Sequence, residues 1–308
     1  MLIEGVLVVD KTEGPTSHDV VKFARRVLGE SRIGHTGTLD PMATGVLPLV
    51  VGRATRVAQF LTASDKTYEA TVAFGRATDT YDASGTVTHT SDARPTREAI
   101  AAALESFRGT FEQTPPAFSA KNIDGERSYD LARKRARKGE AADAPPAQRP
   151  KAVTVSVRRL ELRSFDGESA RLEMQVTAGF YVRSLVHDLG EVLGCGAVLT
   201  ALRRTRSGEF GLDRAVPLAE LLQDPRESLA ARIVPFRELL TDLPSVTLRS
   251  ALQIERLKNG VEMGPSDVLE PLATLAPVTR LLGPDGDLVG LARPGKSPGH
   301  LHGWVVLA

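Results

Sequence analysis

The sequence predicts an α+β fold built around a largely antiparallel sheet. Stretches of alternating apolar and polar residues, typical of half-buried strands, recur along the chain. Segments with the apolar spacing of helices stand between them. Two long alternating stretches, 153–165 and 170–177, follow each other closely and should pair as antiparallel strands. Runs of strands with intervening helices favour the α+β class.

The expected elements begin with an apolar strand over 5–10 that ends in a Gly-Pro turn. Thr16 or Ser17 should then cap an amphipathic helix that stops at Gly29. Beyond that helix, the same patterns predict strands over 46–51, 66–75, 153–165, 170–177 and 199–206, and helices over 95–107 and 181–193.

A break in the pattern around 241–245 divides the chain into a domain of residues 1–240 and a small unit of residues 245–308. A mostly β unit of this size is small for independent stability, so it should dock on the larger domain. Its expected elements are a helix over 250–259, a hairpin over 278–294 that turns at 284–286, and a last strand over 304–307.

The composition is that of an ordinary globular protein, with 308 residues of which 42% are hydrophobic and 25% charged. Because the sequence has no apolar run long enough to span a bilayer and no secretory leader, we expect a cytoplasmic protein with no membrane partner. Cys195 is the single cysteine, which excludes a disulfide framework and a thiolate metal cage. We expect it to be a small buried residue.

The net charge of +1 does not by itself indicate a nucleic-acid-binding protein, so the distribution of charge matters more. Each basic cluster alone is more typical of a solvated face. Three clusters, each near a motif, favour a surface that follows phosphates. They are Lys22, Arg25, Arg26, Arg32, Arg53 and Arg56; Arg127, Arg133, Lys134, Arg135, Arg137 and Lys138; and Arg203, Arg204 and Arg206.

The glycine-rich string from Gly34 to Pro48 contains one carboxylate, Asp40, directly before a proline. Glycine is used where the backbone approaches a ligand closely or takes positive φ, and Asp-Pro favours a sharp turn before a helix start. Taken alone, Asp40 is more often a helix N-cap and His35 a turn residue. Held rigidly beside a cleft, Asp40 is instead suited to act as a nucleophile or base.

The whole string G-H-T-G-T-L-D-P-x-A-T-G-V-L-P resembles motif II of the TruB family, the bacterial tRNA pseudouridine-55 synthases. The resemblance implies the pseudouridine synthase fold, a mixed central sheet with the active cleft across its middle. It also implies that Asp40 is the catalytic aspartate and that His35 enters the tRNA T-loop, in the space left by a flipped base.

Arg183 lies in a string that matches the family's Tyr-x-Arg motif, which begins here at Tyr181. By resemblance, Arg183 contacts Asp40 and Tyr181 belongs to the substrate pocket. A guanidinium paired with the carboxylate would hold it in place and stabilise its negative charge in a closed site. Without the resemblance, an arginine at a helix start is more often a surface residue.

Three further strings match the family's motifs. Tyr68, in K-x-Y, is implied to stack on the target uracil and to take part in proton handling; the alternative is a core aromatic. Leu202, in L-R-R-T, is implied to line the uracil pocket, with a plain core leucine nearly as well supported. Lys11 begins the K-P-x-G-x-T-S string, with Thr12 in place of proline, and is expected to make a structural or phosphate contact beside the cleft.

The sequence departs from the family over 115–129, where Asn122 stands at the usual lysine position and Lys121 lies one place early. The polar, basic segment that follows resembles the family's mobile thumb, a loop of about 121–150 expected to order on binding. Residues 245–308 resemble in position the PUA-like RNA-binding domain that ends many of these synthases.

The resemblance implies a tRNA pseudouridine synthase that acts on the T-stem-loop and needs neither metal nor cofactor. We expect a monomer that works without a guide RNA, since the chain has no long basic tail for docking in a ribonucleoprotein. The alternative is an RNA-binding protein that refolds tRNA, with catalysis secondary. A P-loop nucleotide hydrolase is excluded, because the sequence has no Gly-Lys-Ser/Thr element.

Overall fold

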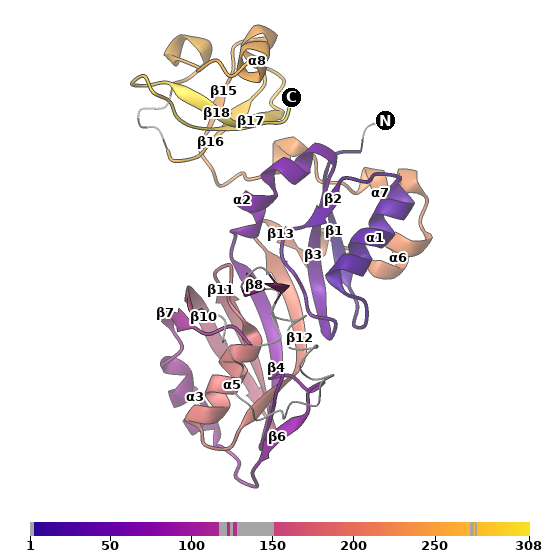
Figure 1. Cartoon of the computed structure of the whole chain (residues 1–308), viewed down its shortest axis with the longest axis vertical. Coiled ribbons are helices and arrows are strands. Elements are labelled where there is room, and N and C mark those ends of the chain that lie inside the picture. The colour runs from indigo at the N-terminus through magenta and orange to yellow at the C-terminus, as the bar shows by residue number, and fades with distance from the viewer. Residues whose placement is uncertain (1–2, 117–121, 124–125, 128–150, 272–273, 275) are drawn as a thin grey trace.

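The computed structural model describes residues 3–116, 122–123, 126–127, 151–271, 274 and 276–308, and it confirms the α+β class. A ten-stranded sheet spans the large part of the molecule, and a four-stranded sheet forms the C-terminal unit at one end of it (Figure 1). The predicted thumb, including Lys121, lies outside the described residues except for two short strand pieces.

The large sheet has the strand order β14-β1-β3-β12-β4-β11-β10-β7, with β2 paired to β3 and β13 to β12. Most neighbours are antiparallel; β1–β14 and β3–β12 are parallel. Its strands are β1 (Gly5–Lys11), β2 (Ile33–His35), β3 (Ala43–Val51), β4 (Lys66–Phe74), β7 (Gly109–Gln113), β10 (Val153–Phe165), β11 (Ser169–Val176), β12 (Ala197–Ser207), β13 (Phe210–Gly211) and β14 (Val216–Pro217).

The helices of this part lie in two groups on the sheet (Figure 1). One group packs beside β1 and the other beside β10 and β12. The first is α1 (Ser17–Leu28), α6 (Leu218–Gln223) and α7 (Arg226–Ala231); the second is α3 (Arg97–Glu105) and α5 (Val182–Val192); α2 (Ala58–Thr62) lies toward the C-terminal unit. Two small hairpins complete it: β5 (Arg76–Thr78) with β6 (Val87–Thr90), and β8 (Asn122–Ile123) with β9 (Glu126–Arg127).

Helix α1 shows how local sequence sets its bounds. Thr16 is the N-cap: its side chain accepts a hydrogen bond from the backbone N–H of Asp19, and the Asp19 carboxylate accepts one from the backbone N–H of Thr16. Gly29 ends the helix in the left-handed conformation, at φ 63°.

Strand β1 is buried on both faces, which explains its continuous apolar run. Leu7 and Val9 belong to the main core under the helices, whereas Val6 and Val8 belong to a second core on the opposite face. Leu291 and other residues of the C-terminal unit complete this second core. The C-terminal unit therefore docks on the large sheet, as its small size predicts.

The C-terminal unit has the sheet order β15-β16-β17-β18 with one helix beside it. Arg56 donates a hydrogen bond to the carbonyl of Val306 at 2.6 Å, and Phe60 packs edge-on against Trp304 with ring centroids 5.0 Å apart. The elements are β15 (Ser245–Thr247), α8 (Ala251–Lys258), β16 (Thr279–Leu282), β17 (Leu288–Pro294) and β18 (Leu301–Val306).

The structure contradicts the alternative in which Asp40 caps a helix. Residues 41–42 form a turn, closed by a hydrogen bond from Ala43 N–H to the Asp40 carbonyl, and β3 begins at once. The apolar residues of 43–51 pair with β1, β2 and β12, and this sheet pairing outweighs the local helix-start signal. Asp40 is therefore not a helix N-cap. Among the described residues, no helix has the length and apolar character to cross a membrane.

Candidate active site

Lys11 holds the loop that carries Asp40 through hydrogen bonds to its backbone. The Lys11 ammonium donates hydrogen bonds to the carbonyl oxygens of Asp40 at 3.2 Å, Pro41 at 3.2 Å, Ala43 at 2.6 Å and Thr12 at 3.0 Å. Lys11 has no exposed surface, and burial lowers its pKa to about 8. Of the two contacts expected for Lys11, these bonds favour the structural one over the phosphate contact, because the ammonium donates to oxygens inside the protein.

Arg204 binds the backbone on either side of Asp40 in the sequence. Its Nε donates to the carbonyl of Val46 at 2.7 Å and its Nη2 to that of Gly37 at 3.0 Å, and the residue is 1% exposed. This placement follows from the parallel pairing of β12 with β3, in which Arg204 lies opposite Gly45. A Cβ at Gly45 would lie 2.2 Å from the Arg204 carbonyl oxygen, so the close approach requires glycine.

The third predicted phosphate-binding cluster is therefore not a continuous basic surface, since Arg206 is the one exposed arginine of its three. Arg204 is buried, and Arg203 pairs with Asp10 at 2.7 Å. In the first cluster, Arg53 pairs with Glu4 and donates to the carbonyl of Leu307. These arginines bind protein oxygens, which the sequence pattern alone did not reveal. Most of the second cluster lies outside the described residues.

Asp40 and Arg183 are brought together as the resemblance implies. Arg183 Nε lies 2.9 Å from Asp40 Oδ2, and Nη2 donates to Oδ1 at 3.2 Å, which is a bidentate pair. The Arg183 side chain is 7% exposed and that of Asp40 is 34% exposed. The carboxylate thus reaches the surface of the site, while the guanidinium that holds it is buried.

The buried side of Arg183 contacts the loop between β5 and β6, for which the sequence motifs implied no role. Arg183 Nη1 donates to the carbonyl of Thr80 at 3.1 Å and lies 3.7 Å from Asp82 Oδ2. Asp82 is buried and accepts hydrogen bonds from Ser84 N–H at 3.0 Å and from the hydroxyls of Thr80 and Ser84. The alternating Thr80, Asp82 and Ser84 were a usable signal, since such residues build hydrogen-bonded turns.

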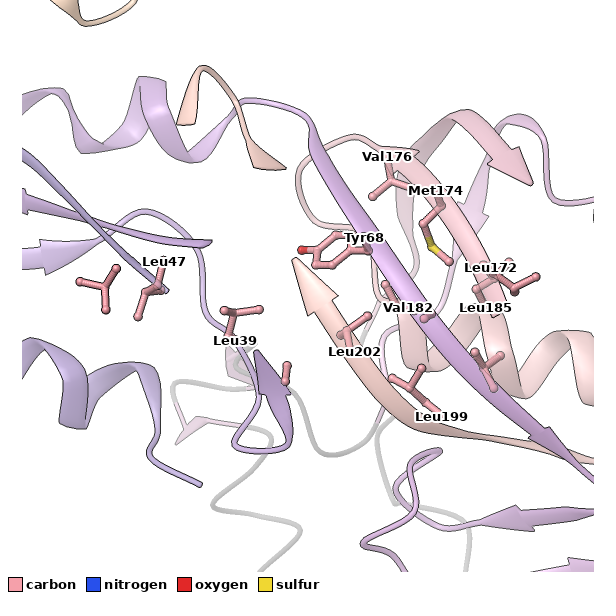
Figure 2. Close-up of a cluster of buried hydrophobic side chains, with 14 of the residues drawn as sticks. Leu39, Leu47, Tyr68, Leu172, Met174, Val176, Val182, Leu185, Leu199 and Leu202 are labelled. Atoms are coloured by element: carbon pink, nitrogen blue, oxygen red, sulfur yellow. The ribbon is translucent and has the colours of Figure 1, made fainter. Parts of the chain in front are cut away.

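Tyr68 and Leu202 both belong to the main hydrophobic core. Tyr68, on β4, is paired across the sheet with Met174 on one side and Arg204 on the other. Both Tyr68 and Leu202 are largely buried, and Figure 2 shows the Tyr68 hydroxyl directed away from β4 toward the side where Leu39 lies. The core alternatives for these two residues thus hold, and they are compatible with a place at the edge of a pocket.

Tyr181 is fixed through its backbone at the start of α5. The side chain of Gln113 donates to the Tyr181 carbonyl at 3.0 Å and accepts from the Tyr181 N–H at 2.8 Å. Gln113 is buried, so β7 sets the entry of the helix that carries Arg183.

His35 lies on β2, half-buried, and its Nδ1 accepts a hydrogen bond from the N–H of Gly37 at 3.4 Å. Burial lowers the pKa of His35, and the positive charge of Arg204 lowers it further. His35 thus lies at the end of β2, and its lowered pKa favours the neutral form of the imidazole. No cluster of potential metal-ligating side chains occurs within the part of the chain that the structure describes.

The fold and sequence are similar to known proteins along most of the chain. The model of "TruB family pseudouridylate synthase (N terminal domain)" matches residues 25–182, and that of "tRNA pseudouridylate synthase B C-terminal domain" matches residues 183–241. The whole of this chain aligns with 86% of a chain in an H/ACA ribonucleoprotein bound to a substrate RNA, with a TM-score of 0.74 and 23% sequence identity. The archaeal Nop10–Cbf5 complex gives TM-score 0.72 with 25% identity, over 100% of this chain and 87% of that one. The class is therefore that of the pseudouridylate synthases.

Relatives in several bacteria narrow this class. A protein of Solibacter usitatus named tRNA pseudouridine synthase B is 45% identical over 94% of this chain and 95% of its own length. Proteins of the same name in Mycolicibacterium paratuberculosis and Aromatoleum aromaticum are 47% and 44% identical, over 73% and 80% of this chain and 75% and 77% of their own lengths. The chain belongs to the TruB family.

Proposed function

We propose that this protein converts the uridine at position 55, in the T-loop of tRNA, into pseudouridine, with Asp40 as the catalytic carboxylate. The observation that carries the proposal is the bidentate pair of Asp40 and Arg183, partly exposed at the carboxylate end. The names of the relatives, each a tRNA pseudouridine synthase B, support the substrate.

The reaction is an isomerisation, in which the C1′–N1 bond breaks, the uracil turns over, and C5 bonds to C1′ while the C5 proton moves to solvent and N1 gains one. No electrons are transferred to another molecule. An ionised, fixed carboxylate beside C1′ can act by direct attack on C1′ or by removing a proton. Arg183 holds Asp40 in one orientation for either step, which lowers the cost of reaching the reactive geometry.

Tyr68, Tyr181 and Leu202 form the proposed uracil pocket beside Asp40. Stacking of a base on an aromatic ring contributes about 1–3 kcal/mol. That stacking offsets much of the few kcal/mol needed to flip a nucleotide out of its stack. His35 is proposed to occupy the space that the flipped base leaves.

The proposed partner is the tRNA T-stem-loop, bound by a monomer that acts in the cytoplasm without a guide RNA. Residues 1–240 are the proposed catalytic domain, with the thumb at about 121–150. Residues 245–308 are the proposed PUA-like RNA-binding domain; both family models end before this unit. A role mainly in tRNA folding is not favoured by the names of the relatives.

The test is Asp40→Asn, which keeps the side chain's shape and removes its charge. We expect pseudouridine formation on an unmodified T-stem-loop, measured by chemical mapping without guide RNA, to be abolished, with affinity within a few-fold. Asp92→Asn, at an exposed turn residue, is the matched control. Wild-type turnover in the Asp40→Asn variant would reject the assigned role, and loss of affinity without loss of chemistry would favour the RNA-folding alternative.

A further inference from the structure

Helix α5 contacts the loop between β5 and β6 with two side chains, not one. Arg183 donates to the carbonyl of Thr80, and His187, one helical turn later, stacks on the ring of Tyr81. The two rings lie nearly parallel, at an interplanar angle of 7° with centroids 3.8 Å apart. Because residues four apart share one helix face, Arg183 and His187 meet consecutive residues of the same loop.

The backbone of Tyr81 adopts a conformation that needs support. Its φ is 66°, in the left-handed region that residues with a Cβ rarely occupy. Hydrogen bonds fix both sides of it: Tyr81 N–H donates to the carbonyl of Thr78 at 3.2 Å, and Leu199 N–H donates to the carbonyl of Tyr81 at 3.1 Å. The stack on His187 adds a side-chain restraint at this strained position.

The restraint on the backbone of Tyr81 also affects the Thr80 carbonyl, which accepts the hydrogen bond from Arg183. The Thr80 carbonyl and the Tyr81 N–H belong to one planar peptide unit, so φ of Tyr81 helps to set where the carbonyl points. The next residue, Asp82, is the buried carboxylate 3.7 Å from Arg183 Nη1. A rotation at Tyr81 would therefore move both groups that hold the buried end of Arg183.

We propose that the stacked pair of Tyr81 and His187 positions Arg183, and through it the catalytic carboxylate of Asp40. The inference rests on the proposed function, since it assigns the pair to the same reaction. Both are positioning residues, because they act through Arg183 and the groups that hold it. A purely packing role predicts lower stability with an unchanged chemical step.

The experiment compares variants that remove the stack with variants that keep it. His187→Ala and Tyr81→Asn remove it, and asparagine tolerates the left-handed backbone better than most residues. His187→Phe and Tyr81→Phe keep two stacked rings. We expect the first two to lower the single-turnover rate on a T-stem-loop about five- to twenty-fold, because small misplacements at a reacting centre are costly, with the dissociation constant within about two-fold.

The stack-keeping variants should recover the rate to within about three-fold of the wild type. The double variant His187→Ala/Tyr81→Asn should be no slower than the slower single variant, because both changes break one contact. In an Arg183→Lys background, His187→Ala should lower the rate by less than about two-fold, because the pair acts through Arg183. His89→Ala, at an exposed histidine on β6, is the matched control.

Amide hydrogen exchange measures the effect of the Tyr81–His187 stack on the nearby backbone and does not depend on enzymatic activity. The Leu199 amide donates to the Tyr81 carbonyl, and the Ala83 amide donates to the Leu199 carbonyl. In His187→Ala, both amides should exchange faster than in the wild type. If the wild type makes no pseudouridine, the proposed function fails, and exchange still reports on the stack. If the wild type is active and His187→Ala keeps its rate, or loses it equally in the Arg183→Lys background, the positioning inference is overturned.

Discussion

The Asp40 loop and the C-terminal unit are both attached to the same sheet, but by different forces. Lys11 and Arg204 hold the Asp40 loop through hydrogen bonds to its backbone oxygens. The C-terminal unit is held mainly by an apolar cluster, in which Leu291 of the unit and Val8 of β1 take part. Hydrogen bonds specify direction, whereas burial of apolar surface does not.

This difference matches what each region has to do. A carboxylate that reacts must be fixed in position and orientation, so buried cations that reach several carbonyl oxygens suit the Asp40 loop. A unit proposed to contact RNA needs only to stay beside the sheet, which an apolar interface achieves. Changes to the polar contacts around Asp40 should therefore alter turnover or stability strongly, whereas the loss of a polar contact at the docked C-terminal unit should have a small effect.

Among the residues that hold Asp40 and the C-terminal unit in place, the largest effect is expected for Arg183→Lys. Lysine keeps the positive charge but cannot hold Asp40 in a bidentate pair while donating to Thr80. Turnover should fall by about 10²–10³, the usual cost of losing one preorganised electrostatic group, with tRNA affinity within a few-fold. Single-turnover kinetics measures this, and near-normal turnover in the variant would show that charge alone suffices.

Arg204→Met should be the most destabilising change. It removes the donor from the buried carbonyl of Val46 and from the partly buried carbonyl of Gly37, at a cost of about 3 kcal/mol in the free energy of unfolding. Urea denaturation measures the loss. Arg206→Met, at the exposed arginine two residues on, is the control, and an equal loss in both variants would contradict the role of Arg204.

Stability should depend on pH through Lys11 and Lys66. Burial lowers the pKa of each to about 8 from 10.5. Between these values the unfolded chain binds more protons than the folded one, so the free energy of unfolding rises with pH. Each group contributes at most about 1.4 kcal/mol per pH unit.

The measurement is urea denaturation from pH 7.5 to pH 9.5, comparing wild type with Lys66→Met. The variant should show a smaller gain over this range, whereas Lys22→Met, at an exposed lysine, should match the wild type. Identical pH profiles for wild type and Lys66→Met would show that the Lys66 pKa is not depressed.

The smallest effect is expected for Arg53→Ala, which tests the docking of the C-terminal unit. The change removes the pair with Glu4 and the bond to the Leu307 carbonyl, so the free energy of unfolding should fall by about 1 kcal/mol. Turnover at saturating tRNA should be unchanged. A large increase in KM would instead return Arg53 to the phosphate-binding surface that its sequence cluster first suggested.

Long elements were predictable because their patterns are strong and local. The alternation over 66–75 gave β4, and the apolar spacing over 181–193 gave α5. Strand β2 and strand β14 were missed, because two or three residues carry no measurable period and form strands only when a neighbour pairs with them.

The candidate site was predictable where a motif carried it. Asp40, Arg183, Tyr68, Tyr181, Leu202 and His35 were named from their strings. Asp82 was missed, Arg204 was placed in a phosphate-binding cluster, and Lys11 was expected to make either a structural or a phosphate contact. A sequence pattern does not show whether a charged residue is buried. Lys11 and Arg204 donate to backbone oxygens inside the protein because the fold buries both side chains.

The sequence by itself determined the class of fold, the main strands and helices, and the residues proposed for chemistry, because periodicity, capping and motif spacing are local properties of a chain. The motifs implied the pair of Arg183 and Asp40, but only the folded chain showed that Lys11 and Arg204 are buried and donate to the backbone of the Asp40 loop. Arg204 reaches the loop across 167 residues of sequence, because the parallel pairing of β12 with β3 joins segments that no local pattern connects. Arg183 reaches Asp40 across 143 residues from the first turn of α5.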